Sequence, residues 1–215
     1  MDILTPSQTR LLTEFSRSSL NDFFFLTGGT ALSAFYLHHR LSEDLDFFTE
    51  QPGQVQQVLP ILNTIAEGLG LRVELRRQFA SYLEVFLHEP EGETIKCDFA
   101  QDSPFRHQPK MRNSTLGFFV DNPLDIACNK LSALFDRAAA KDFVDVYFID
   151  KELLPFKDLL SRAREKHIGI DDYWLAIALQ RVQNIGPMPR MVKPLNKEEV
   201  IQFFLAKARW LMEKE

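Results

Sequence analysis

The sequence FFFLTGGTALSAFYLHHRLSEDLDFFT, residues 23–49, decides the fold and the chemistry of this chain. Residues 23–27 are an apolar run that ends in Gly28-Gly29 and predicts a buried strand, and residues 30–39 have apolar side chains at helical spacing. A second strand is predicted over residues 43–49, where Asp44 and Asp46 alternate with apolar residues. Alternate residues of a strand point to one face, so these two carboxylates project together, roughly 7 Å apart.

This carboxylate pair predicts a divalent-cation site. Two like charges on a half-buried strand repel each other and are poorly solvated, and oxygen ligands suit Mg²⁺. Ser42, Asp44 and Asp46 are expected on one face, opposite Leu45 and Phe47. The alternative is a pair of strand-end aspartates that simply face solvent.

The glycine pair predicts a phosphate-binding corner. Gly28 and Gly29 let the backbone approach a ligand closely, and Thr30 could cap the following helix or contact phosphate. A tight turn with a capped helix is the alternative. Arg40 could balance the carboxylates or bind phosphate, or it could be an ordinary surface arginine. The chain has neither of the glycine-rich signatures of Rossmann and P-loop proteins.

A third carboxylate, Asp98, lies in the predicted strand 94–100 and shares a face with Lys96. An inward aspartate on an apolar strand is unfavourable unless it is paired or binds a metal. Asp98 is therefore a candidate metal ligand and a candidate base for an attacking hydroxyl. The alternative is an outward aspartate that pairs with Lys96.

Two cations are expected on one face of the helix predicted over residues 123–138. Lys130 and Arg137 are seven residues apart, a spacing that suits a triphosphate or a nucleic-acid backbone. Asp142 and Asp145 follow and could position these cations. The alternative is a solvated helix edge on which the same four residues pair.

The whole chain has the composition of a globular protein. It has 215 residues, 45% of them apolar, and a net charge of −5, so its overall charge does not indicate nucleic-acid binding. No apolar run is long enough for a membrane span, and residues 1–10 do not resemble a secretion signal. Cys97 and Cys128 are expected as buried, reduced thiols in a cytoplasmic protein.

The periodicities predict a domain at residues 1–120 that contains both helices and strands, and a helical domain at residues 121–215. The basic segment 101–113 is expected as an exposed loop, and the proline-rich segment 186–194 as a connector. Strands 82–88 and 94–100 are expected as a hairpin. The predicted strands are 23–27, 43–49, 71–79, 82–88, 94–100 and 115–120. The predicted helices are 5–20, 30–39, 52–69 (kinked or divided at Pro60), 123–138, 141–149, 155–166, 171–184 and 197–214.

Several motifs resemble the AbiEii/AbiGii toxin family of nucleotidyltransferases, which is part of the polymerase-β-like nucleotidyltransferase superfamily. The matching segments are residues 28–32, 39–42 and 44–48, with a second signature over residues 125–147. The resemblance implies an α+β fold, a nucleotidyltransferase-like mixed β-sheet with flanking helices, followed by a C-terminal helical bundle. It implies two Mg²⁺ ions on Asp44, Asp46 and Asp98, with NTP as donor. It also implies that Lys130 contacts the triphosphate and that Asp142 or Asp145 supports the site.

We therefore expect a cytoplasmic, Mg²⁺-dependent nucleotidyltransferase that moves a nucleoside monophosphate from NTP to a hydroxyl of RNA, with tRNA as one candidate, or of protein. Segments 101–113 and 186–194 are candidate RNA contacts. Some members of the family are toxins, so a cognate antitoxin is a possible partner. Two alternatives stay open: a catalytically idle binding partner of an antitoxin, and a phosphotransferase on the same core.

Overall fold

The computed structural model describes residues 3–90 and 92–213, which form two compact units. Of these described residues, unit 1 comprises 3–35, 42–90, 92–105 and 109–122. Unit 2 comprises 36–41, 106–108 and 123–213. The division into domains after residue 120 stays a prediction.

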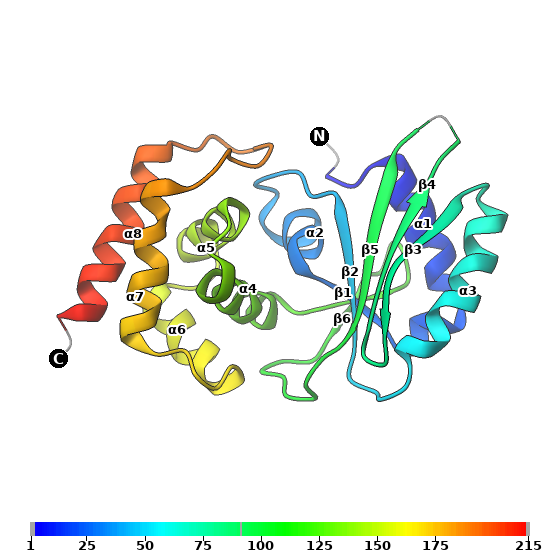
Figure 1. Cartoon of the computed structure of the whole chain (residues 1–215), viewed down its shortest axis with the longest axis horizontal. Coiled ribbons are helices and arrows are strands. Elements are labelled where there is room, and N and C mark those ends of the chain that lie inside the picture. Colours follow the sequence, from blue (N-terminus) through cyan, green and yellow to red (C-terminus); the bar gives the residue numbers. More distant parts are fainter. Residues whose placement is uncertain (1–2, 91, 214–215) are drawn as a thin grey trace. The chain divides into compact units, whose positions relative to one another are not determined.

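Unit 1 is built on a mixed seven-stranded sheet in the order β3-β4-β5-β2-β1-β7-β6 (Figure 1). β2 pairs in parallel with β5, and β1 pairs in parallel with β7, while the other neighbours are antiparallel. The predicted hairpin of β4 and β5 is confirmed, although residue 91 of its turn lies outside the described residues. The strands are β1 (Phe25–Thr27), β2 (Asp44–Thr49), β3 (Arg72–Phe79), β4 (Tyr82–His88), β5 (Thr94–Gln101), β6 (Met111–Arg112) and β7 (Phe119–Val120).

One face of this sheet forms the core of unit 1. Helices α1 (Pro6–Arg17) and α3 (Val55–Gly68) lie on it (Figure 1), and alternate residues of β2, β4 and β5 are buried beneath them. Phe15 of α1 stacks on Phe47 of β2 at 4.4 Å between ring centroids, and Phe47 stacks on Phe99 of β5 at 4.9 Å. The strict alternation of buried and half-buried residues leaves the polar side chains of these strands on the opposite face.

Local chemistry explains where the first helix of unit 1 begins. The Thr5 side chain accepts a hydrogen bond from the Gln8 backbone, the Gln8 side chain accepts one from the Thr5 backbone, and Pro6 occupies the first helical position. α1 ends at Arg17 rather than near residue 20, because Ser18 is extended and starts the short 3₁₀ helix η1 (Ser19–Asp22).

The structure corrects several predicted boundaries. The helix expected at residues 30–39 begins earlier, as α2 (Gly28–Leu32), and continues as the wider π-helix η2 (Ser33–Leu37). Pro60 lies inside a continuous α3, where the buried apolar stripe of Val58 and Leu62 keeps the helix packed. The predicted loop 101–113 contains the short strand β6, and the predicted strand 115–120 is reduced to β7 by the turn at Gly117, which has φ +80°.

Unit 2 is helical, with α4 in contact with α5, α6 and α7, and α8 in contact with α5 and α7. Residues 36–41 belong to this unit, and the backbone of residues 39–41 pairs with the connector 190–193, including Leu41 N–H to the Arg190 carbonyl at 2.8 Å. Residue 214, the predicted end of the last helix, lies outside the described residues. The helices are α4 (Pro123–Arg137), α5 (Ala140–Glu152), α6 (Phe156–Lys166), α7 (Asp172–Gln180), η3 (Arg181–Asn184, a 3₁₀ turn that ends the predicted helix 171–184) and α8 (Lys197–Met212).

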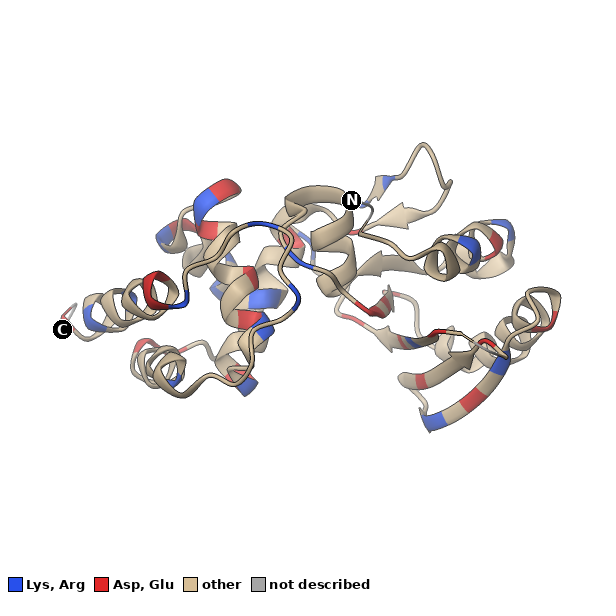
Figure 2. Ribbon diagram, turned by 90° about the horizontal axis from the view of Figure 1, so that it is seen from above, with Lys and Arg blue, Asp and Glu red and all other residues tan. Residues whose placement is uncertain are grey.

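Acidic and basic residues are interspersed over both units (Figure 2). Between residues 3 and 213, residue 91 apart, no helix has the length and hydropathy needed to cross a membrane.

Candidate active site

The two carboxylates of β2 lie on the sheet face opposite α1 and α3. Asp44 and Asp46 are both half-buried, and the residues between and after them, Leu45 and Phe47, are fully buried on the other face. The predicted alternation is therefore present. Both carboxylates are fixed by the backbone of a central strand, since β2 is paired on both edges.

Gly28 is the residue that makes room for Asp46. Its φ is +71°, and a Cβ built on it would stand 2.0 Å from Asp46 Oδ2. Only glycine fits this backbone conformation and this approach without a shift of its neighbour. The glycine corner and the carboxylate strand, predicted separately from the sequence, are thus in contact.

Hydrogen bonds from two side chains, Thr30 and Gln8, fix the backbone where β2 begins. The hydroxyl of Thr30, which is fully buried, donates to the backbone carbonyl of Asp44 and so ties α2 to β2. The Gln8 side chain of α1 donates to the carbonyls of Ser42 at 3.3 Å and Glu43 at 3.0 Å, and this fixes the entry to β2. Both contacts determine where Asp44 begins the strand.

Asp98 is the register neighbour of Asp46 in the parallel pair of β2 and β5. Its Oδ1 accepts a hydrogen bond from the Tyr82 hydroxyl at 2.7 Å, and its Oδ2 accepts one from the Lys96 ammonium at 2.5 Å. The pairing with Lys96 is the alternative that the sequence left open. It coexists with a position directly beside the carboxylate strand.

The protonation states of Lys96 and Tyr82 maintain their hydrogen bonds to Asp98. Burial acts to lower the pKa of Lys96, but the hydrogen bond to Asp98 and the charges of Asp98 and Asp44 outweigh it and raise that pKa above its usual value. Burial and the hydrogen bond to Asp98 also raise the pKa of Tyr82. Both groups therefore keep their protons at neutral pH and donate to Asp98.

The charged face continues across the hairpin onto β4 and β3. Glu84, the register partner of Asp98, has its carboxylate 3.9 Å from Lys96 Nζ and 3.2 Å from Arg77 Nε. Further along, the guanidinium of Arg76 lies 5.3 Å from the ring centroid of Phe86. Cations and carboxylates thus lie side by side from the edge strand β3 to β5.

In unit 2, the predicted residues Lys130, Arg40 and Asp145 form one buried cluster. Arg40 donates to both oxygens of Asp145, at 2.7 and 2.9 Å, and Lys130 Nζ lies 2.8 Å from Oδ2. His39, which was not predicted, places Nε2 2.8 Å from Oδ1. The Asp145 side chain is fully buried, and those of Arg40 and Lys130 are almost so, which differs from the surface arginine and the solvated helix edge considered above.

The electrostatics of this cluster follow from burial and pairing. Burial alone would raise the pKa of Asp145, but Lys130 and Arg40 hold it well below its usual range. Burial lowers the pKa of His39, which outweighs the effect of Asp145 and leaves the ring neutral at pH 7. Because a carboxylate only accepts, Nε2 carries the hydrogen of the neutral ring.

The remaining predicted pair, Arg137 and Asp142, lies at the end of α4 and the start of α5. The guanidinium binds the carboxylate with two hydrogen bonds, at 2.8 and 2.7 Å. Asp142 is fully buried, whereas the Arg137 side chain is 53% exposed. Arg137 therefore has a partly exposed side chain that Asp142 holds in a fixed orientation.

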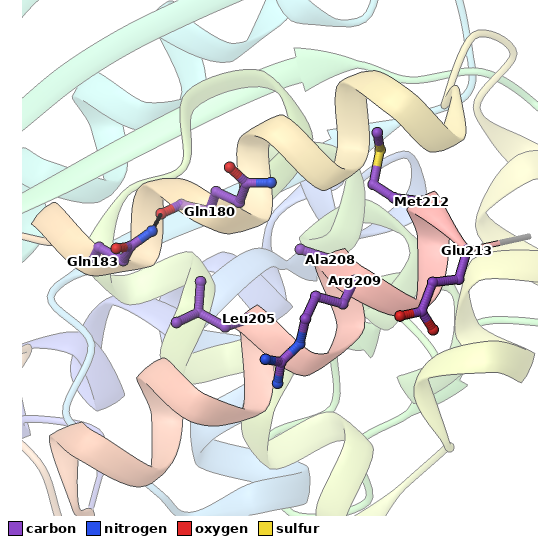
Figure 3. Close-up of a pocket in the computed structure, with 7 residues that line it drawn as sticks. All are labelled: Gln180, Gln183, Leu205, Ala208, Arg209, Met212 and Glu213. Atoms are coloured by element: carbon purple, nitrogen blue, oxygen red, sulfur yellow. Dashed lines mark hydrogen bonds between the residues drawn. The ribbon is translucent and has the colours of Figure 1, made fainter.

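The structure also contains an open groove of about 340 Å³ on the surface of unit 2, between α7, η3 and α8 (Figure 3). Figure 3 shows the side chains of Gln180, Gln183, Leu205, Arg209 and Met212 around it. None of the predicted site residues lines this groove. The predicted site residues lie instead on the carboxylate face of unit 1, in the Asp145 cluster and at the Arg137–Asp142 pair.

The donor set of the carboxylate face fits Mg²⁺ in its chemistry. Asp44 and Asp46 supply oxygen ligands. Because residue 28 is glycine, no Cβ occupies the space beside the Asp46 carboxylate. Over the part of the chain that the structure describes, no three acidic, histidine or cysteine side chains are grouped closely enough to hold an ion by themselves. The remaining ligands of an ion would come from the substrate, as is usual for Mg²⁺ at phosphate sites.

Sequence reasoning missed His39 and Tyr82 as members of these clusters. His39 directly precedes Arg40 in the sequence, and this position could have indicated that both residues belong to one cluster. Tyr82 lies 16 residues from Asp98 and meets it only through the register of the β4–β5 hairpin. A sequence pattern alone does not predict that contact.

A mixed sheet with a glycine corner against an aspartate pair, and flanking helices, defines the nucleotidyltransferase class of fold. The family model described as "Nucleotidyl transferase AbiEii toxin, Type IV TA system" matches residues 10–207, so this chain belongs to that family. The predicted family, fold class and enzyme class are confirmed.

The chain is also similar to individual proteins in sequence or in fold. An uncharacterized protein of Aquifex aeolicus (strain VF5) is 34% identical over 152 residues, which cover 69% of this chain and 68% of the relative. A Helicobacter pylori protein assigned as a nucleotidyltransferase has a similar structure, with a TM-score of 0.64, 19% identity, and coverage of 95% of this chain and 91% of its own. MenT4, a nucleotidyltransferase toxin of Mycobacterium tuberculosis, gives a TM-score of 0.57 at 14% identity, with coverage of 94% and 82%.

Proposed function

We propose that this chain is a Mg²⁺-dependent nucleotidyltransferase that transfers a nucleoside monophosphate from NTP to a hydroxyl and releases pyrophosphate. The observation that supports this most directly is the contact between the glycine corner and the carboxylate strand, where Gly28 leaves room for Asp46. An aspartate pair beside a half-buried glycine is suited to orienting a triphosphate.

In this reaction the acceptor oxygen forms a bond to the α-phosphorus, and the bond from that phosphorus to the pyrophosphate oxygen breaks. The hydroxyl proton passes to a carboxylate, for which Asp98 is the candidate because it neighbours Asp46 in the sheet. Asp44 and Asp46 would hold Mg²⁺, which supplies positive charge to the triphosphate and acidity to the hydroxyl. Gly28 and Gly29 would orient the phosphates, and Thr30 would hold this corner in place through its hydrogen bond to the Asp44 carbonyl.

The residues of unit 2 have proposed roles toward the nucleotide. Lys130 would contact the triphosphate, and Arg137 would add a second cation. Asp145 and Asp142 orient these two cations through the ion pairs described above. Arg40 and Lys130 share the Asp145 carboxylate. This carboxylate would neutralise part of their charge before the substrate binds.

We propose RNA as the acceptor, with tRNA as one candidate. The sheet face beside Asp98 carries Tyr82 and Phe86, both half-buried, and ends at Phe79, which is 64% exposed on the edge strand β3. Arg76 and Arg77 accompany them, with side chains 57% and 68% exposed. Aromatic rings with neighbouring arginines are the surface on which unpaired bases stack.

One experiment tests the reaction and the acceptor together. The protein is incubated with each α-labelled NTP, Mg²⁺ and total cell extract, and the label is followed into RNA and protein. Label in RNA with release of pyrophosphate is the expected result. Label in protein would show that the acceptor is protein and not RNA, and ADP release would indicate a phosphotransferase. No transfer with any NTP would refute the proposal.

Two further proposals come from the family. Because the family is one of toxins in toxin–antitoxin systems, we propose that a cognate antitoxin opposes this activity in the cell. The proposed location is the cytoplasm, where NTP is available and where Cys97 and Cys128, which form no disulfide in the structure, would remain reduced. Toxicity on induction, relieved by the antitoxin gene, is the expected result.

A further inference from the structure

Both oxygens of Asp98 already have hydrogen-bond partners within unit 1. Lys96 Nζ lies 2.5 Å from Oδ2, and the Tyr82 hydroxyl lies 2.7 Å from Oδ1. Lys96 and Asp98 are two residues apart on the same strand face, so the strand geometry itself brings the ammonium to the carboxylate. The Lys96 side chain is 27% exposed and that of Asp98 is 13% exposed, which limits screening by water.

Lys96 also lies where a second divalent ion would be expected. It is the register neighbour of Asp44, Asp98 is the register neighbour of Asp46, and the Glu84 carboxylate is 3.9 Å from the ammonium. An ammonium in contact with a carboxylate oxygen repels a divalent cation from the same oxygen, because both would share one ligand at short range.

We propose that Lys96 takes the place of a second metal ion at Asp98, so that the site holds a single divalent ion on Asp44 and Asp46. This inference rests on the proposed function, and it departs from the two-ion arrangement that the family resemblance implies. Lys96 acts as a positioning residue: it neutralises Asp98 and fixes its orientation beside Asp46. Each oxygen of Asp98 has two lone pairs, so the contacts with Lys96 and Tyr82 leave capacity for the proton of the acceptor hydroxyl.

The test counts bound ions without using activity. Mn²⁺ is titrated by electron paramagnetic resonance in the presence of a non-hydrolysable α,β-imido NTP analogue, each of the four bases being used in turn. The wild-type chain is expected to bind one Mn²⁺. Two ions in the wild type would overturn this inference and leave the proposed function intact, whereas no ion with any analogue would overturn both.

Variants of Lys96 and Tyr82 test whether Lys96 determines the number of bound Mn²⁺ ions. Lys96→Met is expected to bind two Mn²⁺ ions and to show a larger rise in melting temperature on Mn²⁺ addition than the wild type. Lys96→Arg and Tyr82→Phe, which keep a cation at Asp98, are expected to bind one. A single ion in a folded Lys96→Met chain would overturn the inference. Should Lys96→Met fail to fold, the wild-type and Lys96→Arg counts still decide, since two ions in either contradict it.

Discussion

Gly28, at the turn from β1 to α2, is in direct contact with Asp46 of β2, and a Cβ at residue 28 would stand 2.0 Å from Asp46 Oδ2. Gly28→Ala must therefore move the carboxylate as well as strain a backbone with φ +71°. We expect about 1–3 kcal/mol of destabilisation and loss of Mn²⁺ binding. Gly53→Ala is the matched control: φ there is +81°, with nothing within 4 Å of the added Cβ. If both variants bind Mn²⁺ equally, the contact is unimportant for the site.

Asp46→Ala is expected to abolish nucleotidyl transfer while changing the melting temperature little. The substitution removes a half-buried charge from a repulsive pair and takes no volume from the core. A labelled-NTP assay and a thermal melt measure the two effects. Asp158→Ala, an exposed acid in the first turn of α6, is the control and should retain full activity. Substantial transfer by Asp46→Ala would contradict the assigned role.

Asp145→Asn should be among the most destabilising single substitutions in unit 2. It leaves Arg40 and Lys130 buried without their counter-charge, which costs about 3–5 kcal/mol. Asp142→Asn is the comparison, because its partner Arg137 is 53% exposed and can be hydrated. Urea unfolding should show less than half the loss for Asp142→Asn. Equal losses would mean that burial of the partner cation does not decide the cost.

Stability should fall as the pH drops below about 6.5, in part through His39. Burial lowers the pKa of His39 in the folded chain, so between that lowered value and 6.5 the unfolded chain binds more protons. The contribution is complete above pH 6.5 and is lost at no more than about 1.4 kcal/mol per pH unit. His39→Gln keeps a donor for Asp145 but does not titrate. Urea unfolding at pH 7.5 and 5.5 should show a smaller loss for this variant, and an identical loss would exclude His39.

Phe79→Ala is expected to weaken RNA binding by about tenfold, since stacking on one ring contributes roughly 1–3 kcal/mol per base. The Phe79 side chain is 64% exposed, so the fold should be unaffected. Trp174→Ala, which removes an aromatic ring 61% exposed on α7, is the control and should leave RNA affinity unchanged. Filter binding of the labelled acceptor measures both, and equal losses would exclude the β3 face as the RNA contact.

The sequence allowed the local features of this fold to be predicted, because they depend on short-range rules. The alternation around Asp44 and Asp46 places both on one strand face, and the Thr5-Pro6 cap starts α1 where expected. Strand β6 was missed because two residues carry no periodic signal. The shortened β7 follows from a turn at Gly117 that a propensity argument does not locate.

The partners of the site residues were harder to predict. Arg40 and Asp145 are separated by 105 positions in the chain, and nothing in either local pattern says that they share a cluster. For Asp98 the sequence left two possibilities open, pairing with Lys96 or membership of the site. The structure shows the pairing at a position beside the aspartate strand, a combination that depends on the β2–β5 register.

The interleaved connectivity of the two units has a consequence for engineering and for evolution. Residues 36–41 belong to unit 2, although unit 1 surrounds them in the sequence, and there His39 and Arg40 bind Asp145. A helical fragment that begins at residue 123 would therefore lack Arg40, which binds both oxygens of this fully buried acid. Exchange of C-terminal halves between homologues should therefore succeed only when residues 36–41 are exchanged together with them. The two units are then expected to be inherited together and not to be interchangeable.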